Sequence, residues 1–168
     1  MINLIVYGSL INKQELLNKN ISQDRCIPII VKGLKREFSQ EPSWRKSTLN
    51  DRAVLSVFPS KDHHINGILI KDIKESELIE LDHRERGYQR IEIDLSQIET
   101  KYGKNKLNNN KNYIYMGKKQ KYNNKINPNP QYLELCISGA KSWGDDFYVD
   151  FINTTYSKNK ILRELITY

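Results

Sequence analysis

The sequence lacks any apolar run close to the roughly 18 residues that a membrane-spanning helix needs. It also has little cysteine. Only Cys26 and Cys136 occur, both in apolar stretches, which excludes a disulfide scaffold and predicts two reduced core thiols. The first ten residues have no basic segment and only a short apolar one, so they do not read as a signal peptide. We therefore expect one cytoplasmic domain over residues 1–168, long enough to bury a core.

Several signatures of cofactor, metal and hydrolase chemistry are absent as well. There is no Walker or dinucleotide-binding glycine pattern. The two cysteines and the adjacent His63 and His64 do not have the spacing of zinc ligands. Ser9 with one of these histidines and an aspartate would make a hydrolase triad, but the GxSxG elbow is missing. We expect no cofactor and no metal.

The net charge of +7 raises the possibility of a nucleic-acid partner. The basic residues are mostly lysines mixed with asparagine, as in KYGKNKLNNNKNY over residues 101–113, and no RRM, KH or zinc-finger pattern organises them. Trp44 and Trp143 are expected to be core or rim aromatics rather than base-stacking platforms. Nucleic-acid binding is thus a disfavoured alternative, whose mark would be an affinity that falls steeply with salt.

Apolar patterning predicts an α+β chain, with strands mainly in the first two thirds and helices in the last third. Runs rich in Ile and Val, bounded by Gly, Pro or Asp, predict strands at residues 2–6, 26–34, 52–59, 65–73, 88–95 and 112–117. Helical spacing predicts helices at residues 75–85, 131–144, 145–156 and 161–168. Residues 101–111 and 118–130 are expected to be loops.

The first strand runs directly into the turn Tyr7-Gly8-Ser9-Leu10. A glycine at that point permits a close backbone approach, and such a turn can leave several N–H groups pointing in one direction. Converging N–H groups suit an anion or a developing oxyanion. Taken by itself, the pattern also fits an ordinary turn at the end of a strand.

The segment LDHRERGYQRIEI places Glu85 in the last turn of a predicted helix. The helix dipole there disfavours an ionised carboxylate by about 0.3–1 kcal/mol. Burial would raise its pKa further, whereas Arg84, Arg86 and Arg90 would lower it if they lie nearby. A carboxyl group balanced in this way can both accept and donate a proton. The alternative is a surface glutamate paired with one of the arginines.

Three segments together resemble the γ-glutamylcyclotransferase family, including its AIG2-like and ChaC-type relatives. They are VYGSL near the N-terminus, LDHRERGY in the middle and NPQYLELCISGAKSWG later, and they occur in the family order over most of the chain. Two features depart from the family pattern: Arg86 stands where its enzymes usually have glycine, within a shorter spacer, and the loop ends in Leu10, as in ChaC-type and AIG2-like members. The later NPQY and GAKSWG stretches resemble the cyclotransferases proper instead, so the subfamily is mixed and the leaving group is left open.

The resemblance implies a small mixed β-barrel with flanking helices and the release of 5-oxoproline from a small γ-glutamyl amine, amino acid or peptide. It implies that Glu85 is the general acid/base and that Tyr132 contacts the substrate. Tyr88 and Tyr115 are weaker candidates for the pocket wall. The first strand and its loop would bind the γ-glutamyl group through Leu4, Ile5, Val6, Tyr7, Gly8, Ser9 and Leu10. The alternative is a non-catalytic module of the same fold that binds a small ligand or a protein.

Overall fold

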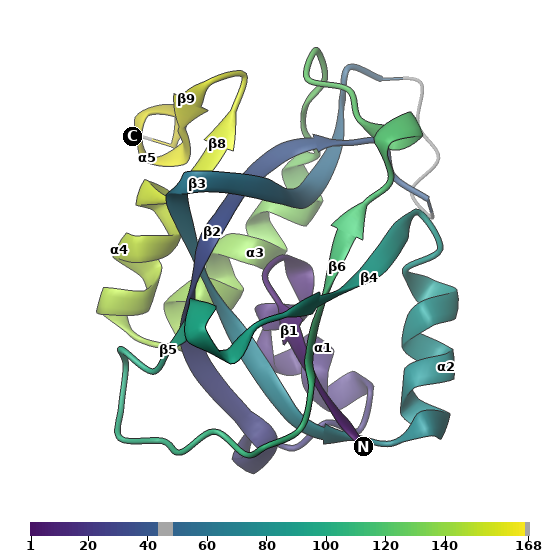
Figure 1. Cartoon of the computed structure of the whole chain (residues 1–168). Helices are drawn as coiled ribbons and strands as arrows, with labels where there is room; N and C mark the ends of the chain where they lie inside the picture. The colour runs from purple at the N-terminus through teal and green to yellow at the C-terminus, as the bar shows by residue number, and fades with distance from the viewer. Residues whose placement is uncertain (44–48, 167–168) are drawn as a thin grey trace.

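A computed structural model describes residues 1–43 and 49–166, so Trp44 lies outside the described residues. Its centre is one mixed sheet with the strand order β4-β6-β1-β3-β2-β8-β9 (Figure 1). These strands are β4 (Tyr88–Ile93), β6 (Asn112–Gly117), β1 (Ile2–Val6), β3 (Asp51–Ile73), β2 (Cys26–Gln40), β8 (Thr155–Ser157) and β9 (Lys160–Ile161).

The expected α+β class is confirmed, but the expected barrel is not formed. A barrel requires its first and last strands to pair, and within the described part of the chain no ladder joins β4 to β9. Two short strands branch from the main path instead: β5 (Ile98–Glu99) pairs with β2, and β7 (Asn127–Pro128) pairs with β3.

Strands β2 and β3 form a long antiparallel pair that bends over the rest of the sheet (Figure 1). The two strands predicted at 52–59 and 65–73 are one strand, because Lys32 pairs with His64 and Leu34 with Pro59 across an irregularity in the register. Strand β1 lies between β3, to which it is antiparallel, and β6, to which it is parallel. The centre of the sheet is therefore next to the loop that follows β1.

The helices are α1 (Lys13–Asn18), α2 (Glu75–Arg84), α3 (Pro130–Ser142), α4 (Asp145–Asn153) and α5 (Leu162–Leu165). Short 3₁₀ turns occupy η1 (Ser9–Ile11), η2 (Gln23–Arg25), η3 (Leu95–Gln97) and η4 (Lys119–Lys121). Two predicted helices are too long. The one at 145–156 ends at Asn153, and its last residues enter β8; the one at 161–168 begins after β9 and spans only α5.

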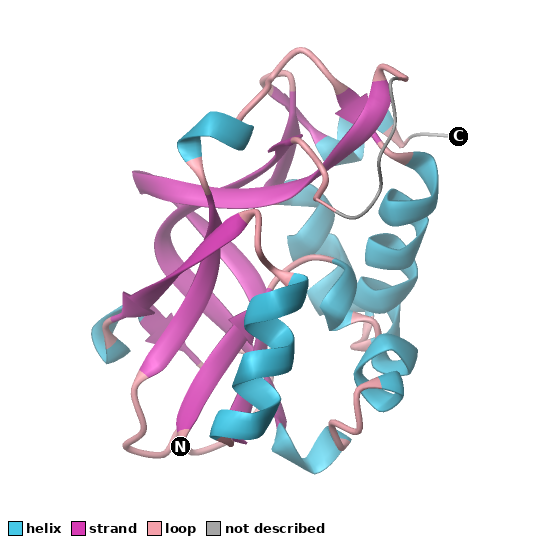
Figure 2. Ribbon diagram, turned by 90° about the vertical axis from the view of Figure 1, so that its right-hand side faces the viewer, coloured by secondary structure: helices cyan, strands magenta, loops and turns pink. Residues whose placement is uncertain are grey.

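The helices lie around the sheet (Figure 2), with α4 at the left edge of Figure 1, α2 at the right edge and α3 behind the strands. Their buried side chains, among them Leu81, Ala140 and Phe147, pack with β1, β2 and β3 into one core. Cys26 and Cys136 are both buried, as expected, and no disulfide joins them. Among the described residues, no helix is long and apolar enough to cross a membrane.

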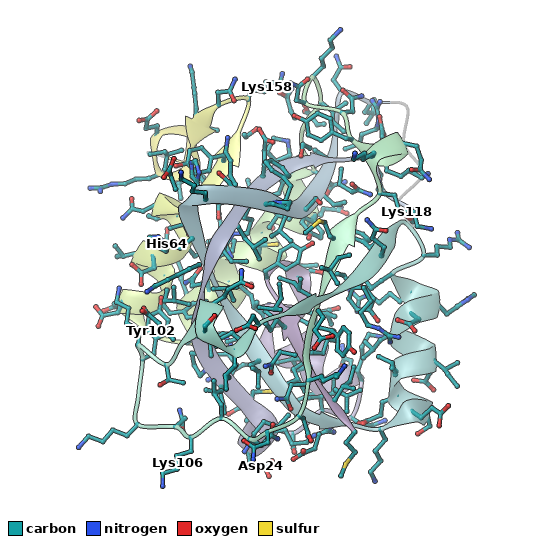
Figure 3. The ribbon with its side chains drawn as sticks, in the orientation of Figure 1. Asp24, His64, Tyr102, Lys106, Lys118 and Lys158 are labelled. Atoms are coloured by element: carbon teal, nitrogen blue, oxygen red, sulfur yellow. The ribbon has the colours of Figure 1, made fainter. Side chains whose placement is uncertain are left out.

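Three of the lysines lie far apart from one another. Figure 3 shows Lys106 at the bottom of the molecule, Lys118 at the right and Lys158 at the top, each pointing outward from a different loop. A nucleic-acid interface concentrates its cations along the path of the phosphates. The scatter of these three residues gives no support to that alternative.

Candidate active site

The loop after β1 is a short 3₁₀ turn. Its backbone closes through two hydrogen bonds, from Ile11 N–H to the Gly8 carbonyl and from Asn12 N–H to the Ser9 carbonyl, both 3.1 Å. The first N–H groups of a helical turn have no partner within it. Among residues 1–43 and 49–166, those of Ser9 and Leu10 have no recorded acceptor. The turn thus offers two buried amides beside the centre of the sheet.

The segment Asn129-Pro130-Gln131-Tyr132 begins α3. The Asn129 side chain caps the helix by accepting from Tyr132 N–H at 3.0 Å, and Pro130 occupies the first turn, where its missing N–H costs nothing. Tyr132 is buried, with its ring edge-on to Phe38. A methyl group added at Gly8 would lie 2.4 Å from the Tyr132 hydroxyl. Gly8 therefore lets the tyrosine reach the loop.

The later part of α3 also contacts the loop that follows β1. A methyl group at Gly139 would lie 2.8 Å from Asn12 N, so the glycine allows the helix and the turn to touch. Trp143 Nε1–H donates to the Ile11 carbonyl at 2.7 Å, and Asn12 Nδ2 donates to Ser138 Oγ at 3.0 Å. The segment NPQYLELCISGAKSWG therefore holds the loop of the segment VYGSL in place.

Helix α2 positions Glu85 at its C-terminal end. The helix ends at Arg84, and Glu85 is its C-cap, with its N–H bonded to the Leu81 carbonyl at 2.9 Å. Asp82 accepts a 2.6 Å hydrogen bond from the Tyr115 hydroxyl on β6 and forms an ion pair with Arg90 on β4. The first acidic residue of the motif thus attaches the helix end to the sheet, which fixes the position of the second.

Loop and glutamate meet at one small cavity of about 50 Å³. It adjoins a second cavity of about 490 Å³, with which it shares Ser9, Glu85, Tyr88 and Tyr132. The inner cavity is lined by Ile5, Val6, Tyr7, Gly8, Ser9, Leu10, Leu55, Glu85, Tyr88, Tyr115 and Tyr132. The sequence-predicted residues are thus brought to one place, with one exception.

That exception is Leu4, which we expected in the pocket floor. It does not line either cavity; it is fully buried in the core, paired with Ile70 on one side and Tyr113 on the other. Leu4 lies further from the loop along the strand than Ile5 and Val6, which do line the inner cavity. The Ser9 hydroxyl contacts Arg84, and His63 is bonded to Ser60 instead, so these contacts give no support to a triad built on Ser9.

Residues that no motif indicated complete the walls. The Leu55 carbonyl on β3 accepts a 2.7 Å hydrogen bond from the Tyr88 hydroxyl, and the Tyr115 carbonyl accepts a 2.6 Å bond from Tyr7. The outer cavity adds Lys19, Pro42, Ser43, Val54, Glu80, His83 and Arg84. The place of Arg84 in the wall could have been predicted, because it is adjacent to Glu85 in the sequence. For Lys19 and Leu55 no sequence pattern predicts a place in the wall.

Burial dominates the electrostatics of the inner cavity. It raises the pKa of the Glu85 carboxyl, while the positive charges of Arg84 and Lys19 act to lower it. Arg84 Nε lies 3.6 Å from Glu85 Oε1, and the glutamate side chain is 19% exposed. Burial raises the pKa values of Tyr7, Tyr88 and Tyr132 well above the ordinary range, so their hydroxyls stay neutral. Glu85 is the one carboxyl group among the described residues of the inner lining.

The contact between Gly8 and Tyr132 makes a direct prediction. Gly8→Ala is expected to displace the Tyr132 hydroxyl and to destabilise the fold by about 1–3 kcal/mol, as overpacking does. Denaturant unfolding of the variant measures the loss. In a Tyr132→Phe background the clashing oxygen is absent, so the same change should cost clearly less. An equal cost in both backgrounds would show that another contact excludes the side chain.

Comparison with known proteins identifies the fold. No protein-family model matches the chain, and no curated protein matches it. Among solved structures, a γ-glutamyl cyclotransferase aligns with 98% of this chain and 97% of its own at a TM-score of 0.66 and 18% identity. An uncharacterized protein from Homo sapiens aligns with the same coverage and TM-score at 19% identity. A yeast γ-glutamyl cyclotransferase specific to glutathione aligns over 99% of both chains, with a TM-score of 0.59 and 15% identity.

The chain has the fold of the γ-glutamyl cyclotransferases. The resemblance seen in its three motifs is confirmed at that level. The alignments, with TM-scores of 0.59–0.66 at identities of 15–19%, establish the shared architecture alone. The chemistry depends on the residues of the cavity.

Proposed function

We propose that the protein is a γ-glutamyl cyclotransferase that releases 5-oxoproline from a γ-glutamyl amine, amino acid or peptide. The observation that supports this most strongly is the meeting of Glu85 with the Gly8–Leu10 loop in one cavity. One part-buried carboxyl group among the described lining residues shares that cavity with the backbone of the loop, and the reaction needs one proton carrier and one set of oxyanion donors.

The reaction consumes no water. The free α-amine of the γ-glutamyl group attacks its own γ-carbonyl carbon, and the new C–N bond closes a five-membered ring. Glu85 accepts a proton from the attacking nitrogen and passes it to the departing nitrogen as the old amide bond breaks. The nucleophile is tethered to its target, and such attacks reach effective molarities of roughly 10⁵–10⁸ M. One carboxylate is therefore enough, and neither cofactor nor metal is required.

The loop and the tyrosines take the remaining roles. The N–H groups of Ser9 and Leu10 would donate to the γ-glutamyl carbonyl as it becomes an oxyanion, or to its α-carboxylate. Tyr132 would contact the substrate through its hydroxyl, which burial keeps protonated. Ile5 and Val6 would form an apolar floor that holds the bent chain.

The product identifies the reaction. Purified protein incubated with γ-glutamyl amino acids, glutathione and γ-glutamyl amines should release 5-oxoproline and the free amine in equal amounts. In H₂¹⁸O the 5-oxoproline should contain no ¹⁸O from the reaction, because the γ-carbonyl oxygen is retained. Release of ¹⁸O-labelled glutamate would identify a hydrolase instead. No turnover of any of these substrates would favour the non-catalytic binding module.

A further inference from the structure

The outer cavity has no role in the reaction described so far. With about 490 Å³ it is much larger than the inner cavity, and four residues line both: Ser9, Glu85, Tyr88 and Tyr132. The two spaces therefore adjoin, and Glu85 lies at their junction. The inner space, with about 50 Å³, does not hold a whole γ-glutamyl peptide, because each water-sized group needs about 10–15 Å³ of such volume.

The position of Glu85 between the two cavities indicates which part of the substrate the outer cavity would contain. The acid must reach the ring nitrogen and the departing nitrogen in turn. If the bent glutamyl chain lies against the loop, the departing nitrogen is beside Glu85 and whatever it bears extends past that residue. The space past Glu85 is the outer cavity.

Two cations line this space close to the junction. Arg84 reaches across it, with Nη2 3.4 Å from Ser9 Oγ and Nε 3.6 Å from Glu85 Oε1. Lys19, the C-cap of α1, is half-buried, and no carboxylate of the described residues lies within 4.0 Å of its ammonium group. Both charges act on Glu85 by lowering its pKa, which places them within electrostatic reach of the reacting atoms.

Among the described residues, the other charged or titratable side chains of the outer wall are Glu80 and His83, and both of these residues are exposed. A charge in contact with water is screened more than a half-buried one. Lys19 and Arg84 therefore give the inner end of the outer cavity a positive potential that Glu80, at its rim, offsets only in part.

We propose that the outer cavity is the subsite for the leaving group, and that Lys19 and Arg84 select leaving groups that bear a carboxylate. This inference rests on the proposed function and narrows it: the substrate is a γ-glutamyl amino acid or peptide rather than the γ-glutamyl derivative of a simple amine. The Arg84 guanidinium has the planar N–H geometry that matches a carboxylate. Lys19, at the end of α1, adds a point charge.

A matched pair of substrates tests the selection. γ-Glutamyl-alanine and γ-glutamyl-alaninamide differ only in the charge of the leaving group. We expect wild-type kcat/KM to favour the acid, and Lys19→Met and Arg84→Met each to lower the acid-to-amide ratio by about threefold to tenfold, mainly through KM. The ratio cancels any effect of Arg84 on Glu85, because both substrates need the same proton transfer. Lys106→Met removes an exposed lysine at the bottom of Figure 3 and should leave the ratio unchanged.

The outcomes separate the two proposals. If wild type releases 5-oxoproline from neither substrate, nor from the wider panel, the proposed function fails. If it uses both equally and the two variants leave the ratio at one, the function stands and the selection is overturned. A higher kcat/KM for the amide, or for the monoamide of a diamine with its free ammonium, would overturn it as well, because Glu80 would then set the preference.

Discussion

Glu85→Gln is expected to lower kcat by about 10²–10⁴-fold, the usual contribution of a positioned general acid/base. Glutamine keeps the shape of the side chain at the C-cap of α2 but cannot move a proton between the two nitrogens. 5-Oxoproline should therefore still bind, as measured by calorimetry, while its release from substrate stops. Glu75→Gln, an exposed change at the other end of the same helix, is the control and should retain full activity. Full turnover by the Glu85 variant would mean that another group transfers the proton.

The same variant should not lose stability at neutral pH. Because burial raises the pKa of Glu85 above 4.5 in the folded state, its ionised form is less favourable there than in the unfolded chain. The favourable contribution of Glu85 is complete below its unfolded pKa and is lost as the pH rises through the raised folded value. The neutral glutamine avoids this loss. Its Tm should thus equal or exceed that of wild type at pH 7, and the difference should shrink as the pH falls toward about 4.5 and vanish below it. A much lower Tm at pH 7 would indicate that Glu85 has a structural role.

The parts of the site that the sequence predicts are those set by local rules. A run of apolar residues before Gly8 marks a strand and its turn, Asn129-Pro130 marks a helix start, and the spacing of Leu78 and Leu81 places Glu85 at a helix end. Each of these signals lies within a few residues of the feature that it predicts. The meeting of the three segments follows from the fold, which the resemblance supplied.

What could not be predicted depends on partners far away in the chain. The apolar pattern predicts the second strand only as far as residue 34, yet β2 continues to Gln40 with Arg36 and Glu37 buried. Lys19 shows the same limit: no pattern around it predicts that it lines a cavity with Glu85. Burial of a charge is stable only when distant groups satisfy it, and the local sequence does not contain them.

Arg36 is the clearest case, and it makes the second large prediction. Its side chain has no exposed surface, and its guanidinium donates to neutral oxygens from several elements. Nη1 donates to the Asn66 carbonyl at 2.6 Å and Nη2 to Asn66 Oδ1 at 2.8 Å, while Nε donates to Thr155 Oγ1 at 2.8 Å. The group also stacks on the Phe151 ring at 4.1 Å, a cation–π contact. Burial lowers its pKa to about 9, so it stays charged at neutral pH.

Arg36→Met should destabilise the fold by about 3–5 kcal/mol. Methionine fills part of the space but leaves buried oxygens on β3 and β8 without donors, each at a cost of about 1–3 kcal/mol. Denaturant unfolding measures the loss, and Lys32→Met is the control. That lysine lies on the same strand with 59% of its side chain exposed, and its removal should change stability by no more than about 0.5 kcal/mol.

Arg36 also connects the core to the active site. Its Nη1 donates to the Tyr7 carbonyl at 3.3 Å, at the point where β1 turns into the loop. Without this donor the peptide that precedes Gly8 loses its anchor, and the amides of Ser9 and Leu10 lose their fixed direction. Under conditions where Arg36→Met remains folded, 5-oxoproline should therefore bind more weakly than to wild type, whereas Lys32→Met should bind it equally well. Unchanged binding by the folded variant would show that α3, through Trp143 and Gly139, holds the loop by itself.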